Sequence, residues 1–258
     1  MLKETIEGLN IKPDGVYVDV TFGGGGHSKE ILKQLDTGKL IAFDQDTDAE
    51  ANAKEFLSND NYKNKFIFVR SNFAYIKNFL RYHGENKIDG ILADLGVSSH
   101  QFDVENRGFS YRFKGEIDMR MNPEAKISAT DILNNYNEEE LITIFKNFGE
   151  IKNPFKIVKQ ITQARQAEKI TLNEQLVEIL KPVLPENYEF KVLSKIYQAL
   201  RIETNKEIEV LNKFLQDTTN ILNTGGRLVV LTYHSLEDRP VKNFIKTGNP
   251  EGIQDKDL

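Results

Sequence analysis

Four consecutive glycines, Gly23 to Gly26, are the residues of this sequence most clearly arranged to bind a ligand. They follow alternating β-branched and aromatic residues from Val16 to Phe22, which predict a buried strand, and a predicted helix begins after them at His27. Glycines in such a turn let the backbone approach a ligand without an intervening Cβ, and the helix N-terminus points its N–H groups at it. The sequence therefore predicts a binding turn rather than a plain flexible loop.

The spacing of the residues around the turn favours one ligand class over another. A dinucleotide site requires glycine or alanine three residues after the second glycine, where this sequence has Ser28. Asp19, Thr21, Gly23 and Gly25 instead match an acidic residue late in the first strand followed by spaced glycines. This form is typical of S-adenosylmethionine sites. A nicotinamide dehydrogenase is an alternative, and the misplaced third glycine counts against it.

Three further side chains lie at the ends of predicted strands. Asp44 ends the second strand about 20 residues after the glycines, where a carboxylate accepts hydrogen bonds from ribose hydroxyls. Phe73 follows the third strand and either flanks an adenine ring or belongs to the core. Asp94 ends the fourth strand. Ligands of open parallel sheets bind beyond the carboxyl ends of the strands, so we expect these residues to converge at one edge.

The order of the predicted elements indicates an α/β fold with a mostly parallel, Rossmann-like sheet and helices on both faces. The next convincing strand after the fourth begins only near Gly226, whereas a crossover needs about a dozen residues. We therefore expect an inserted all-helical domain at residues 102–201, between the two parts of the main domain at residues 1–101 and 202–258.

Composition excludes several classes of protein. The net charge of −5 argues against nucleic-acid binding over the whole surface, although a local basic face is compatible with it. No apolar run approaches the roughly 20 residues of a membrane span, and the N-terminus lacks the apolar core of a signal peptide. The sequence has 0 cysteines, and none of its 4 histidines pairs at a metal-ligand spacing. We expect a cytoplasmic protein without a metal site.

Six motifs occur in a characteristic order: TFGGGGHS, IAFDQD, ILADLGVSSHQ, RGFSYR with DMRMNP, YQALRIETNKE and HSLEDRPVK. Together they resemble the RsmH (MraW) family of bacterial small-subunit ribosomal RNA (cytosine-N(4))-methyltransferases, from about residue 2 to about residue 246. The resemblance implies a class I methyltransferase domain, S-adenosylmethionine as methyl donor and a helical insert that helps to recognise RNA. It also implies 16S ribosomal RNA as the partner, within the small subunit, and leaves monomer and homodimer open.

The resemblance also assigns cofactor residues to positions of this sequence. The assigned residues are Gly25, Gly26 and His27 in the glycine turn, Asp44 at the ribose, Phe73 beside the adenine, and Asp94 and Gln101 from the DLGVSSHQ segment. The implied reaction transfers a methyl group to the exocyclic amine of a cytidine in the decoding region. Asp94 is the candidate acceptor of an amino hydrogen. Its alternative role is to bind only the cofactor.

Substrate contacts are expected from the segment after Asp94, because a base must leave its stack to react. Phe109, Tyr111 and Phe113 alternate with Ser110 and Arg112, a pattern that suits base stacking with phosphate contacts. The alternative for each ring is packing within the insert. The candidates for phosphate contact are Arg107, Arg112, Arg120 and Arg165, with ordinary solvated charge as the alternative. His234 and Ser235 either line the pocket or start the last helix.

Two departures from the family pattern keep another interpretation open. Family members usually begin with an H-x-P-V-L segment before the LKE that here follows Met1, and they continue further past HSLEDR with a strand pair and a basic stretch. Without the last strands we expect an open sheet edge. The alternatives are therefore a cofactor- or RNA-binding scaffold with little turnover, and a methyltransferase for another substrate, such as DNA or a small amine.

Overall fold

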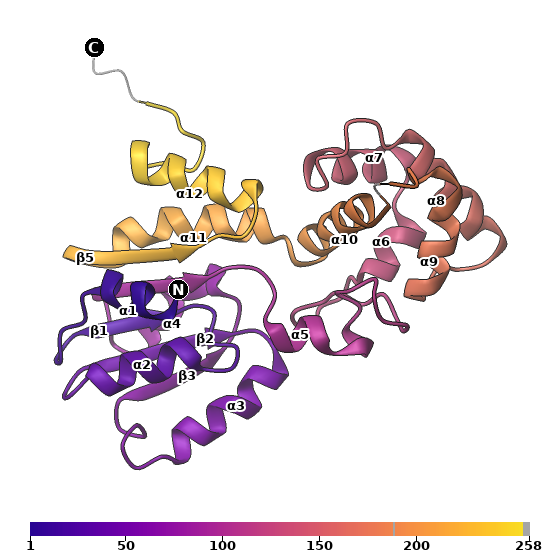
Figure 1. Cartoon of the computed structure of the whole chain (residues 1–258). Coiled ribbons are helices and arrows are strands. Elements are labelled where there is room, and N and C mark those ends of the chain that lie inside the picture. The colour runs from indigo at the N-terminus through magenta and orange to yellow at the C-terminus, as the bar shows by residue number, and fades with distance from the viewer. Residues whose placement is uncertain (188, 255–258) are drawn as a thin grey trace. The chain divides into compact units, whose positions relative to one another are not determined.

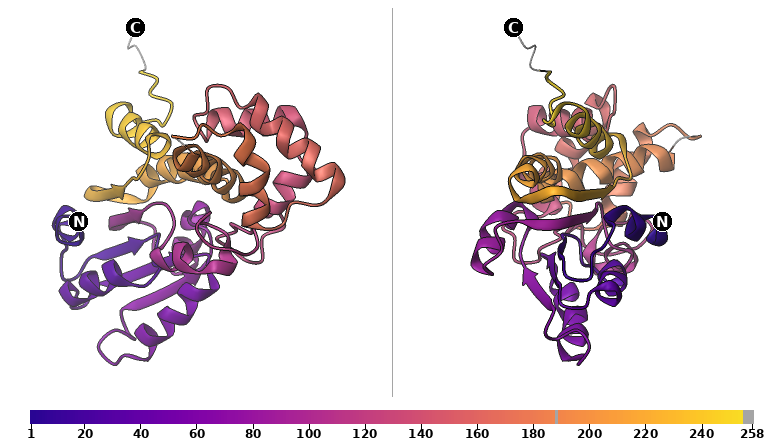
Figure 2. Two further views of the ribbon diagram at one scale, coloured as in Figure 1. Left: turned by 45° about the vertical axis from the view of Figure 1, so that its right-hand side comes forward. Right: turned by 90° about the vertical axis from the view of Figure 1, so that its left-hand side faces the viewer.

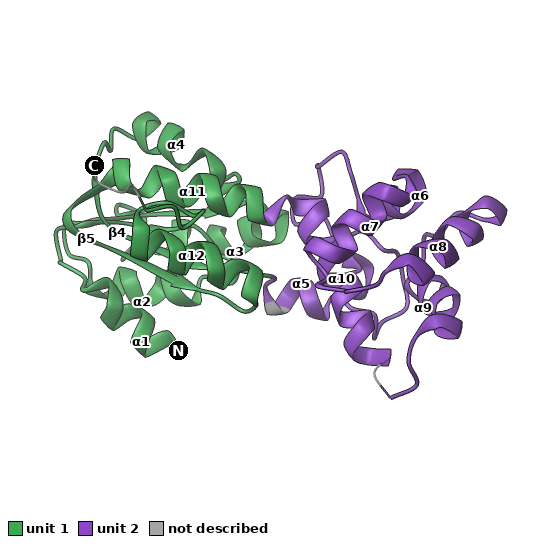
Figure 3. Ribbon diagram, turned by 90° about the horizontal axis from the view of Figure 1, so that it is seen from above, with its two compact units in different colours: residues 1–96, 208–258 green, residues 97–207 purple. Residues whose placement is uncertain are grey.

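The computed structural model describes residues 1–187 and 189–254 and divides the chain into two compact units (Figure 1, Figure 3). The first unit consists of Met1–Gly96 and of the chain from Ile208 onward, and the second of Val97–Glu207. The expected insert at 102–201 falls inside the second unit. Its role in substrate recognition remains a prediction.

A parallel sheet of five strands forms the centre of the first unit, in the order β3-β2-β1-β4-β5. Its strands are β1 (Val16–Asp19), β2 (Lys39–Asp44), β3 (Phe66–Arg70), β4 (Ile88–Asp94) and β5 (Leu222–Leu231). The chain adds strands outward on one side of β1 and then crosses to its other side. The loops after β1 and β4 therefore flank the switch point where α/β sheets bind ligands. The expected α/β fold with a parallel sheet is confirmed.

Strand β5 begins earlier than the sequence predicts. It starts at Leu222 instead of near Gly226, since Leu222 already pairs with β4. An irregularity then interrupts this pairing. Ile88 pairs with Leu222, whereas Gly90 already pairs with Arg227. The glycines at 225 and 226, which mark the start of the strand in the sequence, lie inside this irregular stretch.

Helices cover both faces of this sheet (Figure 1, Figure 2). They are α1 (Leu2–Leu9), α2 (Gly26–Gln34), α3 (Thr47–Ser58), α4 (Ile76–Tyr82), α11 (Glu207–Ile221) and α12 (Ser235–Thr247), with a 3₁₀ turn at Phe73–Tyr75. Successive strand residues point to opposite faces. Leu40 and Ala42 of β2 accordingly pack in the cluster that includes α1, α2 and α3, and Ile41 and Phe43 in the cluster that includes α4, α11 and α12.

The second unit is helical. It contains α5 (Ser99–Asp103), α6 (Ala129–Asn135), α7 (Glu138–Asn147), α8 (Phe155–Ala167), α9 (Asn173–Leu180) and α10 (Glu189–Asn205), with 3₁₀ turns at Glu105–Arg107 and Lys181–Val183. Leu141, Phe145, Ile161 and Leu200 are among the fully buried residues of its core. None of the helices within residues 1–187 and 189–254 has the length and apolar composition of a membrane-spanning helix.

Candidate active site at the carboxyl end of the sheet

Three of the four glycines differ in what they do in the turn between β1 and α2. Gly25 has φ +75°, and a Cβ added there would lie 2.6 Å from Cζ of Phe56, so both backbone and packing require glycine. A Cβ added at Gly24 or Gly26 would meet no heavy atom within 4 Å. Gly25 therefore shapes the turn. Gly24 and Gly26 border open space beside the N-terminus of α2, which is where a ligand can approach the backbone.

A buried carboxylate at the end of β1 accepts hydrogen bonds from residues on both sides of the glycines. Asp19, at the end of β1, accepts hydrogen bonds from Oγ of Ser28 at 2.7 Å and from the backbone nitrogen of Thr21 at 3.1 Å. Burial raises the pKa of Asp19 above its usual value. Ser28, which departs from the dinucleotide pattern, is thus the partner that a buried carboxylate needs.

Asp44 holds the same turn from the end of β2. Its Oδ2 accepts from the backbone nitrogen of Gly23 at 2.8 Å, and its Oδ1 accepts from that of Asp46 at 2.9 Å. Burial is the main cause that raises the pKa of Asp44 to about 6. Each carboxylate oxygen has a second lone pair, so these bonds are compatible with ribose hydroxyls as additional donors.

Phe73 packs against the core of the first unit. Its ring meets that of Phe214 edge-on, with the centroids 5.2 Å apart. It is nevertheless only partly buried. Phe73 thus packs against the core with part of its ring, and its other part is accessible. Contact with an adenine ring stays a prediction.

Asp94, at the end of β4, contacts residues of the turns that follow β1 and β5. Its backbone nitrogen donates to Oγ1 of Thr21 at 2.7 Å. Oδ1 of its carboxylate accepts from the hydroxyl of Tyr233 at 2.7 Å, and Oδ2 lies 3.7 Å from Nδ1 of His27. The side chain is 28% exposed. His27 and Tyr233 thus both lie beside the carboxylate of Asp94, and their roles at a bound cofactor or substrate stay predictions.

Tyr233 is the residue of this site that sequence reasoning missed. The hydrogen bond to Asp94 is the largest cause, before burial, that raises its pKa to about 12. The signal was available, because Tyr233 follows β5 as Phe73 follows β3. The sequence pattern instead favours its neighbours His234 and Ser235, which belong to the HSLEDRPVK motif.

His234 lies beside a buried glutamate at the start of α12. Its Nε2 is 3.2 Å from Oε1 of Glu237, and the other oxygen of Glu237 accepts from the backbone nitrogen of Tyr233 at 2.9 Å. Ser235 is the first residue of α12, so it starts the last helix, which is one of its two expected roles. The HSLEDR motif therefore fixes the turn that presents Tyr233.

The remaining candidates belong to the second unit. The side chain of Gln101 is buried, and its Oε1 accepts from the backbone nitrogen of Ser98 in the capping box of α5. Phe109 is 6% exposed and belongs to the core of the unit. Phe109 thus packs within the insert, and its ring is not accessible for stacking on a base.

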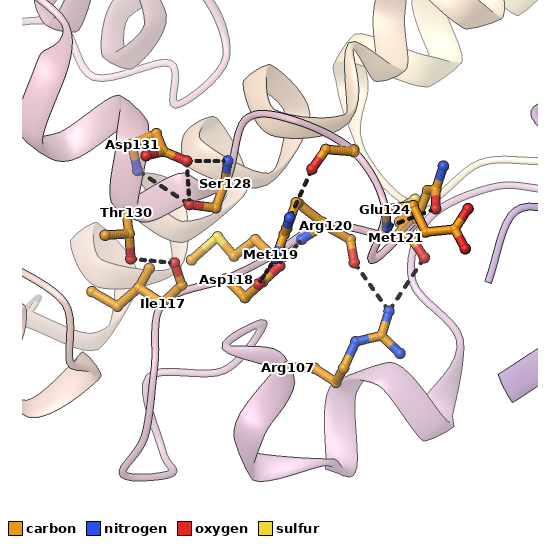
Figure 4. Close-up of polar contacts among 12 residues, drawn as sticks. Arg107, Ile117, Asp118, Met119, Arg120, Met121, Glu124, Ser128, Thr130 and Asp131 are labelled. Atoms are coloured by element: carbon orange, nitrogen blue, oxygen red, sulfur yellow. Dashed lines mark hydrogen bonds and ion pairs between the residues drawn. The ribbon is translucent and has the colours of Figure 1, made fainter. Parts of the chain in front are cut away.

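Three of the four arginine candidates for phosphate contact form hydrogen bonds within the second unit, and Figure 4 shows two of them, Arg107 and Arg120. Nη2 of Arg107 donates to the carbonyl oxygens of Arg120 and Met121 at 3.0 and 3.3 Å. Arg120 forms a two-bonded ion pair with Asp118, at 2.9 and 2.6 Å. Arg165 donates to the carbonyl oxygen of Leu133. Hydrogen bonds thus organise the segment around the DMRMNP motif.

Tyr111 and Arg112 lie nearer to solvent. The ring of Tyr111 stacks on that of Phe190 with the centroids 6.2 Å apart, and Phe190 is 70% exposed. The side chain of Arg112 is exposed. Tyr111 is partly buried against the core of the unit, so Phe190 is the exposed ring of the pair. An exposed ring beside an exposed arginine is compatible with stacking on an unpaired base.

The sequence matches the MraW methylase family over residues 1–254. It is 55% identical over 259 aligned positions to a ribosomal RNA small subunit methyltransferase H of Bacteroides fragilis, covering 100% of this chain and 83% of the relative. The corresponding protein of Flavobacterium psychrophilum is 54% identical, with 100% and 87% covered. A solved structure of a putative rRNA-methylase from Clostridium thermocellum has a TM-score of 0.33 and 15% identity over 38% of this chain and 54% of its own. That structural likeness is too low to support an argument.

Proposed function

The chain belongs to the MraW methylase family, and we propose that it methylates the exocyclic N(4) amine of a cytidine in 16S ribosomal RNA. Similar proteins named ribosomal RNA small subunit methyltransferase H support ribosomal RNA as the substrate class. The methyl donor is S-adenosylmethionine. The choice of cytidine N(4), the decoding region and the small subunit as partner rests on the resemblance of the motifs. We place the reaction in the cytoplasm.

The observation that best supports this proposal is the position of Asp94 between the glycine turn and the turn after β5. The bound donor supplies an electrophilic methyl group on sulfur. The cytidine amine is a weak nucleophile, because its lone pair is delocalised into the ring. Asp94 accepts one amino hydrogen, which directs the lone pair toward the methyl group and offsets the positive charge that develops on nitrogen. As the nitrogen–carbon bond forms and the sulfur–carbon bond breaks, the amine proton leaves toward this carboxylate or water.

The chain offers a cradle that fits the donor. Gly24 and Gly26 border open space at the N-terminus of α2, and Asp44 has lone pairs left for ribose hydroxyls. We assign Gly25, Gly26 and His27 to the donor's methionine part. Phe73, at the end of β3, is assigned to the adenine ring.

The other assignments concern the second unit. Gln101 remains a candidate for cofactor contact, although its side-chain oxygen Oε1 already accepts from the backbone nitrogen of Ser98 in the capping box of α5. We assign RNA recognition to the helical unit, with Tyr111 and Arg112 as the retained contact candidates. Arg107 and His234 then act by holding their own segments, since each is engaged by neighbouring residues.

Transfer of a labelled methyl group to small ribosomal subunits that lack the modification tests the proposal. Label on a cytidine N(4), lost in Asp94→Ala, is the expected result. Label on another nucleoside, on DNA or on a small amine would replace the substrate assignment. Cofactor binding without transfer to any of these would identify a noncatalytic binding module, and absence of cofactor binding would overturn the interpretation of the glycine turn.

A further inference from the structure

The hydroxyl of Tyr233 and the carboxylate of Asp94 form a direct contact between two strand ends of the first unit. We propose that Tyr233 is a positioning residue, whose hydroxyl occupies Oδ1 of Asp94 and so presents Oδ2 to the amino group of the substrate. This inference rests on the proposed function. It adds a role for a residue outside the cofactor cradle.

The geometry distinguishes the two carboxylate oxygens. Oδ1 receives a hydrogen bond of 2.7 Å from Tyr233, whereas Oδ2 lies 3.7 Å from Nδ1 of His27, beyond hydrogen-bonding distance. A carboxylate with one oxygen held in this way has a fixed orientation about its Cβ–Cγ bond. Oδ2 is therefore the oxygen that we assign to the amino hydrogen. An orientation fixed before the substrate arrives lowers the cost of reaching the reactive geometry.

Tyr233 is itself held in place for this role. Its backbone nitrogen donates to Oε2 of Glu237, a buried residue of α12. The hydroxyl of Tyr233 is the donor of the bond to Asp94, and this bond is the largest cause of the raised pKa of Tyr233. The titratable groups near this pair are Glu237 on α12, His27 on α2 and Asp19 on β1.

The exposure of Tyr233 separates this role from a structural one. Its side chain is 59% exposed, so loss of one oxygen atom leaves no cavity in the core. A residue retained only for stability would be expected to change the melting temperature when altered. A positioning residue should instead change the rate of the bound complex.

The first experiment compares Tyr233→Phe with the unaltered protein in methyl transfer to small ribosomal subunits. We expect kcat to fall about tenfold, the effect of about one hydrogen bond to a charged group, with the dissociation constant of S-adenosylmethionine and the melting temperature unchanged. Tyr82→Phe, at an exposed tyrosine of α4, is the matched control and should leave kcat unchanged. A kcat within twofold of the unaltered protein in Tyr233→Phe would overturn the proposal.

A second measurement does not depend on turnover. In protein with ¹³C-labelled tyrosine, the resonance that disappears in Tyr233→Phe reports the protonation of this hydroxyl. We expect its midpoint to lie above the ordinary value of about 10 in the unaltered protein and to be lower in Asp94→Asn, where burial and Glu237 still raise the pKa. An equal midpoint in both proteins would show that the contact is not made. If no protein transfers methyl groups to RNA, the proposed function fails, and this titration still decides the contact.

Discussion

The backbone nitrogen of Asp94 donates a hydrogen bond of 2.7 Å to Oγ1 of Thr21, which ties the strand of the candidate catalytic carboxylate to the turn after β1. The two residues are 73 positions apart in the chain and meet because β1 and β4 are neighbours in the sheet. The oxygen of Thr21 thus sets the distance between the glycine turn and Asp94.

Replacing Thr21 by valine should therefore lower the stability of the protein. The change keeps the side-chain shape but leaves the N–H of Asp94 without its acceptor, and we expect a loss of about 1–3 kcal/mol in the free energy of unfolding. Thr21→Ser keeps the acceptor and is the control, which should lose less than half as much. Urea denaturation measures the free energy of unfolding of both variants. Equal losses in the two variants would mean that the methyl group, and not the hydroxyl, matters.

The glycine turn yields a pair of substitutions with opposite expected effects. Gly25→Ala places a Cβ 2.6 Å from Phe56 at φ +75°, so it should destabilise the protein strongly. Gly26→Ala adds a methyl group in open space within the first turn of α2, so helix propensity should raise stability by up to about 1 kcal/mol. The same methyl group should weaken S-adenosylmethionine binding, measured by calorimetry. Unaltered affinity in Gly26→Ala would remove Gly26 from the cofactor site.

Asp44 should make stability depend on pH in a defined window. Its pKa of about 6 in the folded protein exceeds the unfolded value of 3.8, so the folded state binds more protons between these values. The free energy of unfolding should therefore fall as pH rises from about 4 to about 6, by up to roughly 2 kcal/mol from this group. Denaturation of Asp44→Asn across this range should lack that part of the slope. Parallel pH profiles for the two proteins would contradict the assignment.

Two phenylalanines of the second unit should respond differently to truncation. Phe109→Ala removes a core side chain and should cost about 3–5 kcal/mol in the free energy of unfolding. Phe190→Ala removes an exposed ring and should cost less than about 1 kcal/mol. If Tyr111 and Phe190 stack on RNA, Phe190→Ala should also weaken RNA binding in a filter assay. A small stability change in Phe109→Ala would show that this ring is not part of the core.

Local patterns were sufficient for the main features of the first unit. The alternation of residues in β1 and β2, the glycine turn and the carboxylates at strand ends are read from neighbouring positions, and a parallel sheet then places strand ends at one edge. The resemblance of six ordered motifs predicted the family, which the match over residues 1–254 confirms. The roles of the individual cofactor residues remain predictions.

Tertiary structure decided where several plausible site residues lie and which groups they contact. The pattern around Phe109 and Tyr111 is the same in sequence, yet one ring is in the core and the other stacks near solvent, because burial depends on what packs against each position. Tyr233 and Asp94 are 139 positions apart, and only the pairing of β4 with β5 brings them into contact. Sequence by itself determined the family, the parallel sheet and the position of the glycine turn, because these depend on local spacing. The partners of Asp94 and the core position of Phe109 depend on contacts between distant segments, which local spacing does not encode.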